Sequence, residues 1–269
     1  MIVVAFQGEK GAYSEEAIMK HYVKVETLPC PYLKDVFDAV ESGEADYGLV
    51  PVENTIQGSI VRAYDLLNER ELKASGEEIH RIQHCLISHP DSSLEDIRKA
   101  YSHPQALGQS REWLEALDIE AVNFYDTAGG VKWIKENDVR GAAGVASAQA
   151  AETYGMKILA RSIETNPENY TRFIEIGYDA PDPSGEDKSI LAFIVQHRPG
   201  TLVEALREFS ERGINLEKIE SRPRLGKPFE YVFFVEIAGH ILDEVVTGAL
   251  EGLQKHTLYL RHLGSYPRA

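Results

Sequence analysis

The segment 179–187 constrains the fold of this chain more than any other feature. It reads Asp-Ala-Pro-Asp-Pro-Ser-Gly-Glu-Asp, and its two prolines, its glycine and its polar side chains favour an irregular, extended backbone. Clear hydrophobic periodicity precedes and follows it. We therefore interpret it as a linker between domains at residues 1–178 and 188–269. A chain of 269 residues is long enough for two, since one domain typically takes about 100–200 residues.

Strands alternate with helices along residues 1–178. The expected strands are 2–6, 47–52, 82–87, 121–124 and 142–145, and the expected helices are 14–22, 36–40, 60–67, 106–117, 128–135 and 147–154. This alternation is typical of mostly parallel sheets covered by helices. Because so many short strands are unusual in one doubly wound sheet, we predict two lobes, residues 1–76 plus 161–178 and residues 77–160.

The order of elements changes after the linker. The sequence predicts strand 189–197, helix 201–212, strands 215–221 and 231–237, helix 242–254 and strand 259–263. This βαββαβ order is that of ferredoxin-like folds. No nucleophile–base pair is evident, so we interpret the domain as a ligand sensor. The loop 199–202 could receive an amino-acid carboxylate at the helix N-terminus, and Glu220 could bind its ammonium group.

Charge and cysteine content limit the possible partners and location. The formal net charge of -15 argues against nucleic acid or an anionic membrane as a main partner, because both require a positive face. The only cysteines, Cys30 and Cys85, lie far apart and match reduced thiols of an intracellular protein. The apolar run 2–6 is too short for a signal peptide, and no stretch approaches the length of a membrane span. We expect a soluble cytoplasmic protein.

Ligands of parallel sheets bind in the loops after the strands. The candidate loops are 8–13, 51–58, 102–105, 125–129 and 146–147. Several carry small or hydroxyl residues, which favours a cleft. The segment 8–15 lacks the lysine of a phosphate loop and the third glycine of a dinucleotide fingerprint, so carboxylate binding at the following helix is favoured over nucleotide binding.

Several polar residues of these loops have two interpretations. Asn54 and Thr55 either bind a ligand or form an ordinary turn. His103, just before Pro104 at a helix start, acts as an acid or base or else caps the helix. His80 and His84 are four residues apart, but on a strand this places them about 13 Å from each other. We therefore expect no metal site there.

The run Asn169-Tyr170-Thr171-Arg172-Phe173 precedes an apolar strand. On a regular strand Thr171 and Phe173 share one face and Arg172 points to the other. If the backbone bends at the strand entry, all three border one cleft and supply a hydroxyl donor, an anion ligand and an aromatic surface. Considered alone, the run is more typical of an ion pair at a strand start.

Taken together and in order, five segments resemble those of prephenate dehydratases. They are Gly8-x-x-Gly11-Ala12-Tyr13-Ser14, Val50-Pro51-Val52-Glu53-Asn54-Thr55, Ser102-His103-Pro104-Gln105-Ala106-Leu107, Asn169-x-Thr171-Arg172-Phe173 and Glu220-Ser221-Arg222-Pro223. The resemblance covers nearly the whole chain. It implies an α/β fold with a two-lobed catalytic domain, similar to periplasmic binding proteins, followed by a ferredoxin-like ACT regulatory domain.

The resemblance also implies a function. Prephenate dehydratases convert prephenate to phenylpyruvate, water and carbon dioxide on the way to L-phenylalanine, with feedback by L-phenylalanine at ACT-domain interfaces. We expect a homodimer or homotetramer that needs no cofactor and no metal. Two alternatives stay open: the same chemistry on arogenate, and a non-catalytic metabolite sensor.

The resemblance assigns roles to individual residues. Thr171 would assist departure of the hydroxyl group, Arg172 would hold a carboxylate, and Phe173 would flank the ring. The other substrate-binding residues implied are Ser14, Asn54, Thr55, Ser102 and Gln105. The L-phenylalanine site would include Gly200, Leu202, Val203, Glu220, Ser221, Arg222 and Pro223.

The chain departs from the usual family pattern at a few positions. Thr55 replaces a more common Ser, Ser110 stands where Cys is common, and Thr201 stands where Ala is usual. The run Asp126-Thr127-Ala128-Gly129-Gly130 replaces a Ser-Thr-Ala-x-Ala-Ala-like run. None of these changes removes Thr171, Arg172 or Phe173.

Overall fold

The structure, a computed structural model, describes residues 1–224, 226–227 and 229–269. The chain forms two compact units, the first from residues 1–59 and 78–173 and the second from residues 60–77 and 174–269. Their boundaries fall inside strands β5 (Lys73–Arg81) and β11 (Tyr170–Gly177). As compact bodies the units thus group residues 60–77 with the C-terminal region. No helix in the described part of the chain is long and apolar enough to cross a membrane.

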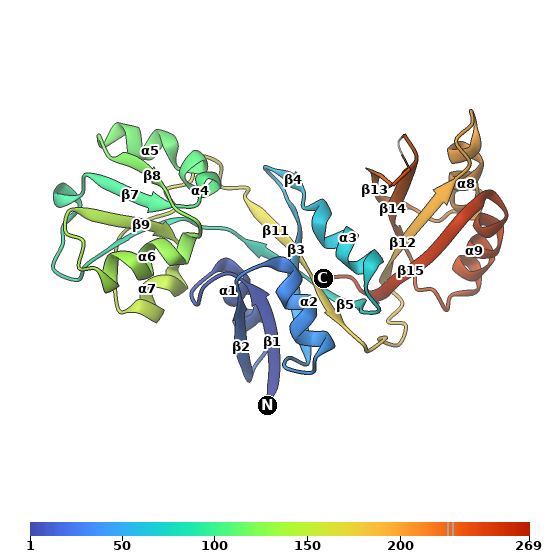
Figure 1. The fold of residues 1–269 in the computed structure, drawn as a ribbon, viewed down its shortest axis with the longest axis horizontal. Helices are drawn as coiled ribbons and strands as arrows, with labels where there is room; N and C mark the ends of the chain where they lie inside the picture. Colours follow the sequence, from blue (N-terminus) through green and yellow to red (C-terminus); the bar gives the residue numbers. More distant parts are fainter. Residues whose placement is uncertain (225, 228) are drawn as a thin grey trace. The chain divides into compact units, whose positions relative to one another are not determined.

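The first unit begins with a parallel arrangement of strands (Figure 1). Its elements are β1 (Ile2–Gln7), α1 (Tyr13–His21), β2 (Val25–Cys30), α2 (Leu33–Glu41), β3 (Tyr47–Asn54) and β4 (Gly58–Ser59). β1 lies between β2 and β3. After β3 the chain turns back, and β4 pairs antiparallel with the last two residues of β3. Val4, Phe6 and Leu49 pack against Ile18 of α1 and form the core of this lobe.

A separate five-stranded sheet forms the other lobe of the first unit, in the order β10-β6-β9-β7-β8. Its strands are β6 (Cys85–Ser88), β7 (Lys99–Ser102), β8 (Glu120–Asn123), β9 (Ala142–Ala146) and β10 (Lys157–Arg161), with a short helix η1 (Leu94–Asp96). Its helices are α4 (Pro104–Gln109), α5 (Arg111–Ala116), α6 (Thr127–Glu136) and α7 (Ala148–Tyr154). α4 and α5 pack on one core cluster and α6 and α7 on another, so both faces of the sheet are covered. This is the layered α/β arrangement that the sequence predicts.

The helix expected over residues 106–117 is in fact two short helices. The helix is interrupted at Ser110, which separates α4 from α5 and is fully buried. α4 begins at Pro104, as its sequence position predicts.

The C-terminal part of the second unit has the predicted βαββαβ order (Figure 1). Its elements are β12 (Asp187–Val195), α8 (Thr201–Ser210), β13 (Leu216–Pro223), β14 (Tyr231–Ala238), α9 (Glu244–His256) and β15 (Thr257–Pro267). The antiparallel sheet has the order β13-β14-β12-β15. Leu191 and Phe193 pack with Phe209 and Leu253, which places both helices on one face of the sheet.

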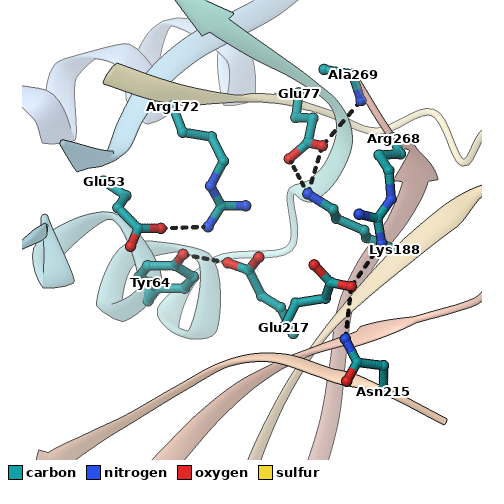
Figure 2. A network of polar contacts seen from close by, with 10 residues as sticks. Glu53, Tyr64, Glu77, Arg172, Lys188, Asn215, Glu217, Arg268 and Ala269 are labelled. Atoms are coloured by element: carbon teal, nitrogen blue, oxygen red, sulfur yellow. Dashed lines mark hydrogen bonds and ion pairs between the residues drawn. The ribbon is translucent and has the colours of Figure 1, made fainter. Parts of the chain in front are cut away.

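Residues 60–77 belong to this unit through polar contacts. Asp65 of α3 (Val61–Glu69) binds Arg222 at 2.9 Å, and Arg261 donates to the carbonyl of Asn68 near the end of α3 at 2.7 Å. Lys188 forms an ion pair with Glu77 at 2.8 Å, and the Glu77 side chain is fully buried (Figure 2). A buried charge requires such a partner.

Candidate active site

Thr171 and Arg172 face opposite sides of a regular strand. β11 begins at Tyr170 and alternates from there, so Thr171 turns toward Asn54 while Arg172 forms an ion pair with Glu53 at 3.2 Å (Figure 2). Asn54 and Glu53, adjacent residues of β3, thus contact opposite faces of β11. The expectation that a bend brings all three residues of the Thr171–Phe173 run to one cleft is wrong, because the strand alternation is kept.

Phe173 belongs to the hydrophobic core of the first lobe. Its side chain is 2% exposed and packs with Val4, Phe6 and Ile18. Its ring supports the strand from inside the lobe, and the predicted contact with a substrate ring stays a prediction.

Asn54 has a fixed amide orientation. Its Oδ1 accepts hydrogen bonds from the backbone N–H groups of Ile56, at 3.0 Å, and Gln57, at 3.1 Å. Backbone amides only donate, so they hold the oxygen of the amide on their side. The NH2 group of Asn54 must then point to its three acceptors, which are Thr171 Oγ1 at 3.1 Å, Asn169 Oδ1 at 2.9 Å and the Tyr170 carbonyl at 3.1 Å.

This orientation determines what Thr171 can do. Because Asn54 donates to Oγ1, the Thr171 hydroxyl acts as an acceptor inside the protein and keeps its own hydrogen for another partner. Among the described residues the structure shows no acceptor for that hydrogen. Thr171 is 8% exposed, so the donor is held in a largely desolvated position.

The hydrogen bonds continue from Asn169 to the second lobe. Asn169 Nδ2 donates to Gln109 Oε1 at 3.1 Å, and the same oxygen lies 2.7 Å from His84 Nε2. His84 Nδ1 lies 2.6 Å from the Tyr13 hydroxyl. We call this set the Thr171 hydrogen-bond chain; its members are Tyr13, His84, Gln109, Asn169, Asn54 and Thr171.

Burial keeps the far end of this chain uncharged. Burial raises the pKa of Tyr13 well above its usual value, with nearby Cys85 and Glu16 adding to the effect. Burial also lowers the pKa of His84, against smaller opposing effects of Gln109 and Glu164. Both groups are therefore neutral near pH 7 and act through hydrogen bonds.

Sequence reasoning missed two members of the chain. Gln109 and His84 were given no role in substrate binding, and His84 was considered only as a metal ligand with His80. In the structure His80 pairs with Glu16 at 3.3 Å and does not converge with His84. No group of three or more His, Cys, Asp or Glu side chains in the described ranges could hold a metal ion. The only signal for Gln109 is its place in the helix after Pro104.

Three other predicted site residues take supporting positions. Thr55 Oγ1 donates to the carbonyl of Glu168 at 2.8 Å and accepts from the backbone of Tyr170 at 3.0 Å, which ties β3 to β11. Ser102 is 0% exposed and donates to the Val145 carbonyl, and its predicted contact with a substrate stays a prediction. Ser14 is buried in the first turn of α1.

Gln105 lies in a cleft of the first unit. This cleft has a volume of about 700 Å³ and is lined by Gln105, His103, Glu9, Tyr125, Asp126 and residues of the loop after β2. Glu9, from the first lobe, accepts hydrogen bonds from Tyr125 and Lys132 of the second at 3.0 and 2.9 Å. These contacts join the two lobes beside the cleft.

Asp126 and His103 act as helix caps. Asp126 Oδ1 accepts from the backbone of Gly129 at 2.7 Å at the start of α6, and burial raises the pKa of Asp126. His103 accepts from the Gln105 backbone at 3.4 Å at the start of α4. The capping interpretation of His103 is thus the one observed.

The segments predicted to bind L-phenylalanine line different pockets of the second unit. Gly200, Leu202 and Val203 line a pocket of about 460 Å³ at the start of α8, together with Glu230 and residues 195–199, which we call the Gly200 pocket. Gly200 has a φ of 90°, a conformation that favours glycine.

Arg222 and Pro223 line another pocket, of about 610 Å³, beside α3. Arg222 is held there by Asp65, while Glu220 and Ser221 lie on the same strand, β13. β13 is at the edge of its sheet. Within one chain, therefore, the two predicted segments do not form a single pocket.

The fold defines a class of α/β proteins in which a two-lobed unit is followed by a ferredoxin-like domain. Comparison with known families agrees. The prephenate dehydratase family matches residues 4–181, and the ACT domain matches residues 189–254. The chain belongs to the prephenate dehydratase family and carries a C-terminal ACT domain.

Curated relatives extend along the whole chain. It is 41% identical to a bifunctional chorismate mutase/prephenate dehydratase of Aquifex aeolicus, over 100% of this chain and 74% of that protein. It is 39% identical to arogenate dehydratase/prephenate dehydratase 2 of Arabidopsis thaliana, over 98% of this chain and 72% of that protein.

Solved structures agree closely with the fold. A prephenate dehydratase from Arthrobacter aurescens, in complex with L-Phe, is 32% identical with a TM-score of 0.91, covering 100% of this chain and 90% of its own. A protein described as a novel type of quorum quenching acylase is 33% identical with a TM-score of 0.93, covering 99% of this chain and 98% of its own.

Proposed function

We propose that this chain catalyses the decarboxylating dehydration of prephenate to phenylpyruvate in L-phenylalanine biosynthesis. Membership of the prephenate dehydratase family over residues 4–181 supports the reaction. The orientation of the Thr171 hydroxyl supports the mechanism and is the single observation on which it depends.

The reaction needs little more than help for a poor leaving group. The bond to the ring carboxylate breaks and releases carbon dioxide, its electron pair forms a ring double bond, and the hydroxyl on the opposite ring carbon leaves. With one proton taken up, that hydroxyl becomes water. Aromatisation of the ring drives the reaction, so a donor to the departing oxygen is the main requirement, worth roughly 10²–10⁴-fold in rate.

Thr171 is suited to this role because Asn54 occupies a lone pair of its oxygen. The hydroxyl hydrogen is therefore not used by Asn54, and in our proposal it is donated to the leaving oxygen. Burial of Thr171 strengthens such a hydrogen bond, since the local dielectric is low. An alcohol is a weak acid, so we assign Thr171 an oriented donor role.

The substrate carboxylates require donors as well. The NH2 groups of Gln105, in the cleft, and of Gln109 are suited to this role. We assign Arg172 to its ion pair with Glu53, where it orders the strand that carries Thr171. The proposed site is thus rich in neutral donors and uses no metal or cofactor.

Regulation by L-phenylalanine is the second part of the proposal. The L-Phe complex of the Arthrobacter aurescens relative supports an amino-acid ligand for the ACT domain. Because Gly200 and Arg222 line different pockets within one chain, we propose that a second copy brings the Glu220–Pro223 segment of one subunit to the Gly200 pocket of another. This requires a homodimer or a homotetramer. We propose that the enzyme is cytoplasmic, by analogy with its bacterial relatives.

One assay tests the catalytic proposal against its alternatives. Purified protein receives prephenate or arogenate in separate reactions, and phenylpyruvate and phenylalanine are measured by chromatography, with and without added L-phenylalanine. We expect phenylpyruvate from prephenate at the higher kcat/KM, and inhibition by L-phenylalanine. A higher kcat/KM for arogenate would make the chain an arogenate dehydratase, and no product from either substrate would make it a sensor.

A further reaction mixture addresses the structural neighbour described as an acylase. It contains an N-acyl amide substrate in place of prephenate. In the described part of the first unit the hydroxyl–imidazole contact is Tyr13–His84, and burial disfavours the phenolate that a nucleophile would require. We therefore expect no amide hydrolysis above background.

A further inference from the structure

The hydrogen-bond chain behind Thr171 has one consistent set of donors and acceptors. Asn54 is fixed by two backbone amides, so Asn169 must present its oxygen to Asn54 and its NH2 group to Gln109. Gln109 must then accept through Oε1. His84 meets the same oxygen with Nε2, which consequently carries the hydrogen.

Tyr13 completes this assignment from the other lobe. With Nε2 protonated and the ring neutral, Nδ1 of His84 is an acceptor and takes the Tyr13 hydroxyl hydrogen at 2.6 Å, a shorter contact than the 3.3 Å from the same hydroxyl to the Gln83 carbonyl. The two rings also meet edge to face, with centroids 5.6 Å apart. The backbone amides of Ile56 and Gln57 thus determine the donors and acceptors of the whole Thr171 hydrogen-bond chain, as far as Tyr13 of α1.

His84 is held firmly on its backbone side. Its N–H donates to Glu164 Oε2 at 2.8 Å, and its carbonyl accepts from the Ile163 N–H at 3.1 Å. The residue is only 2% exposed. The imidazole is thus a rigid support and makes no contact with solvent that a substrate could use.

The contact from His84 matters because it leaves the NH2 group of Gln109 available to another partner. With Oε1 turned inward to two donors, the NH2 group of Gln109 has no partner within the described ranges and is not among the buried atoms that lack one. It therefore reaches solvent as a donor. The opposite tautomer of His84 would present an acceptor at Nε2 and favour a flipped Gln109, which would offer an oxygen to an anionic substrate.

We propose that His84 is a positioning residue: its Nε2–H fixes the Gln109 amide with the NH2 group toward the substrate, and Tyr13 holds the imidazole in that tautomer. This inference rests on the proposed function, because it gives Gln109 a carboxylate-bearing substrate. It adds that one neutral histidine tautomer determines whether the site offers a donor or an acceptor.

A spectroscopic measurement tests the tautomer without any assay of activity. Long-range ¹H–¹⁵N NMR spectra of protein with ¹⁵N-labelled histidine distinguish protonated from unprotonated ring nitrogens, and His84→Gln identifies the signals of this residue among 9 histidines. We expect Nε2 protonated and Nδ1 unprotonated near pH 7. The reverse pattern, or a doubly protonated ring, would overturn the proposal.

Two substitutions then separate positioning from packing. The amide of Gln reaches the place of Nε2 and retains a donor to Gln109, whereas that of Asn reaches only the place of Nδ1. We expect His84→Asn to raise KM by about tenfold to a hundredfold, the effect of losing one hydrogen bond to a charged group, and His84→Gln to recover much of it. His80→Gln is the matched control, since His80 is also buried but pairs with Glu16, and neither residue belongs to the Thr171 hydrogen-bond chain.

The outcomes distinguish this inference from the proposed function. If wild-type protein turns over neither prephenate nor arogenate, the function fails while the NMR result still decides the tautomer. If turnover occurs but both His84 variants keep the wild-type KM, the positioning role is wrong. Should His84→Asn not fold, Tyr13→Phe decides in its place, with an expected mixture of tautomers and a smaller rise in KM.

Discussion

The Thr171 hydrogen-bond chain and the Gly200 pocket are built in different ways. In the first, side chains from both lobes of one unit satisfy one another, and their polarity follows from two backbone amides after β3. In the second, the loop before α8 lines one pocket while Arg222 of the partner segment lines another and pairs with Asp65. In our proposal, a single chain thus contains the complete catalytic arrangement but only separate parts of the regulatory one.

This difference suggests how catalysis and control are separated. The proposed catalytic donors all come from the first unit of one chain, so in our proposal their properties are set when one chain folds. The regulatory segments are completed by association in our proposal, so their properties depend on a second copy. The predictions below test each side of this comparison in turn, beginning with the catalytic side.

Thr171→Ala should have the largest effect. It removes the donor to the leaving oxygen, so we expect kcat to fall at least about a hundredfold, while Thr171→Ser, which keeps the hydroxyl, should retain much of the activity. Steady-state kinetics with prephenate measure both. Activity of Thr171→Ala close to that of wild type would remove Thr171 from the mechanism.

Asn54→Asp should have the next largest effect. A carboxylate cannot donate to Thr171 Oγ1, and it places a second acceptor against Asn169 Oδ1 in a buried position. We expect kcat to fall about tenfold or more and the protein to lose about 1–3 kcal/mol of stability. Asn137→Asp, at the exposed end of α6, is the control; equal kinetics for the two variants would contradict the polarity that we assign to the chain.

Gly200→Ala should affect regulation and leave catalysis intact. A side chain at a φ of 90° is strained by about 1–2 kcal/mol, which shifts the start of α8 and its pocket. We expect the inhibition constant for L-phenylalanine to rise about tenfold while kcat without the inhibitor is unchanged. Gly185→Ala is a matched control, because its φ is 93° but it lies in the linker. Unchanged inhibition in Gly200→Ala would place the ligand elsewhere.

Acid should weaken the unit that carries the regulatory segments, with the smallest of these effects. Burial, with Lys73 adding, lowers the pKa of His262 from 6.5 to about 4. The unfolded chain therefore takes up this proton first, and stability falls as the pH decreases from about 6.5 toward 4, by roughly 1–3 kcal/mol. Thermal unfolding of wild type and His262→Gln at several pH values checks this; a variant with the same pH dependence as wild type would exclude His262 as the cause.

Local patterns in the sequence predicted the elements whose periodicity is strong. The βαββαβ order after residue 188 follows from regular alternation, and α4 starts at Pro104 as expected. The break at Ser110 was missed, because the apolar spacing continues through it while the backbone does not. The strands β2, β5 and β10 are also absent from the prediction. β2 and β10 are mostly exposed or half-buried, and the buried positions of β5 include the polar residues Ser75, Glu77 and His80.

The site was harder to predict than the fold. Motif order predicts roles for Thr171 and Asn54, but the partners of Gln109 and His84 lie 25 to 71 residues away and leave no local pattern. The alternation of Thr171 and Arg172 was visible in the sequence. The sequence does not show whether the strand bends there, because the straight strand is held by contacts between strands, such as the ion pair between Arg172 and Glu53.

The most direct test of the comparison is a dilution series with prephenate as substrate. Activity per chain and inhibition by a fixed concentration of L-phenylalanine are measured while light scattering reports the oligomeric state. We predict that activity per chain stays constant as the oligomer dissociates, whereas inhibition by L-phenylalanine disappears. Inhibition that persists in the monomer, or activity that falls in parallel with dissociation, would contradict a catalytic site completed by one chain and a regulatory site completed by two.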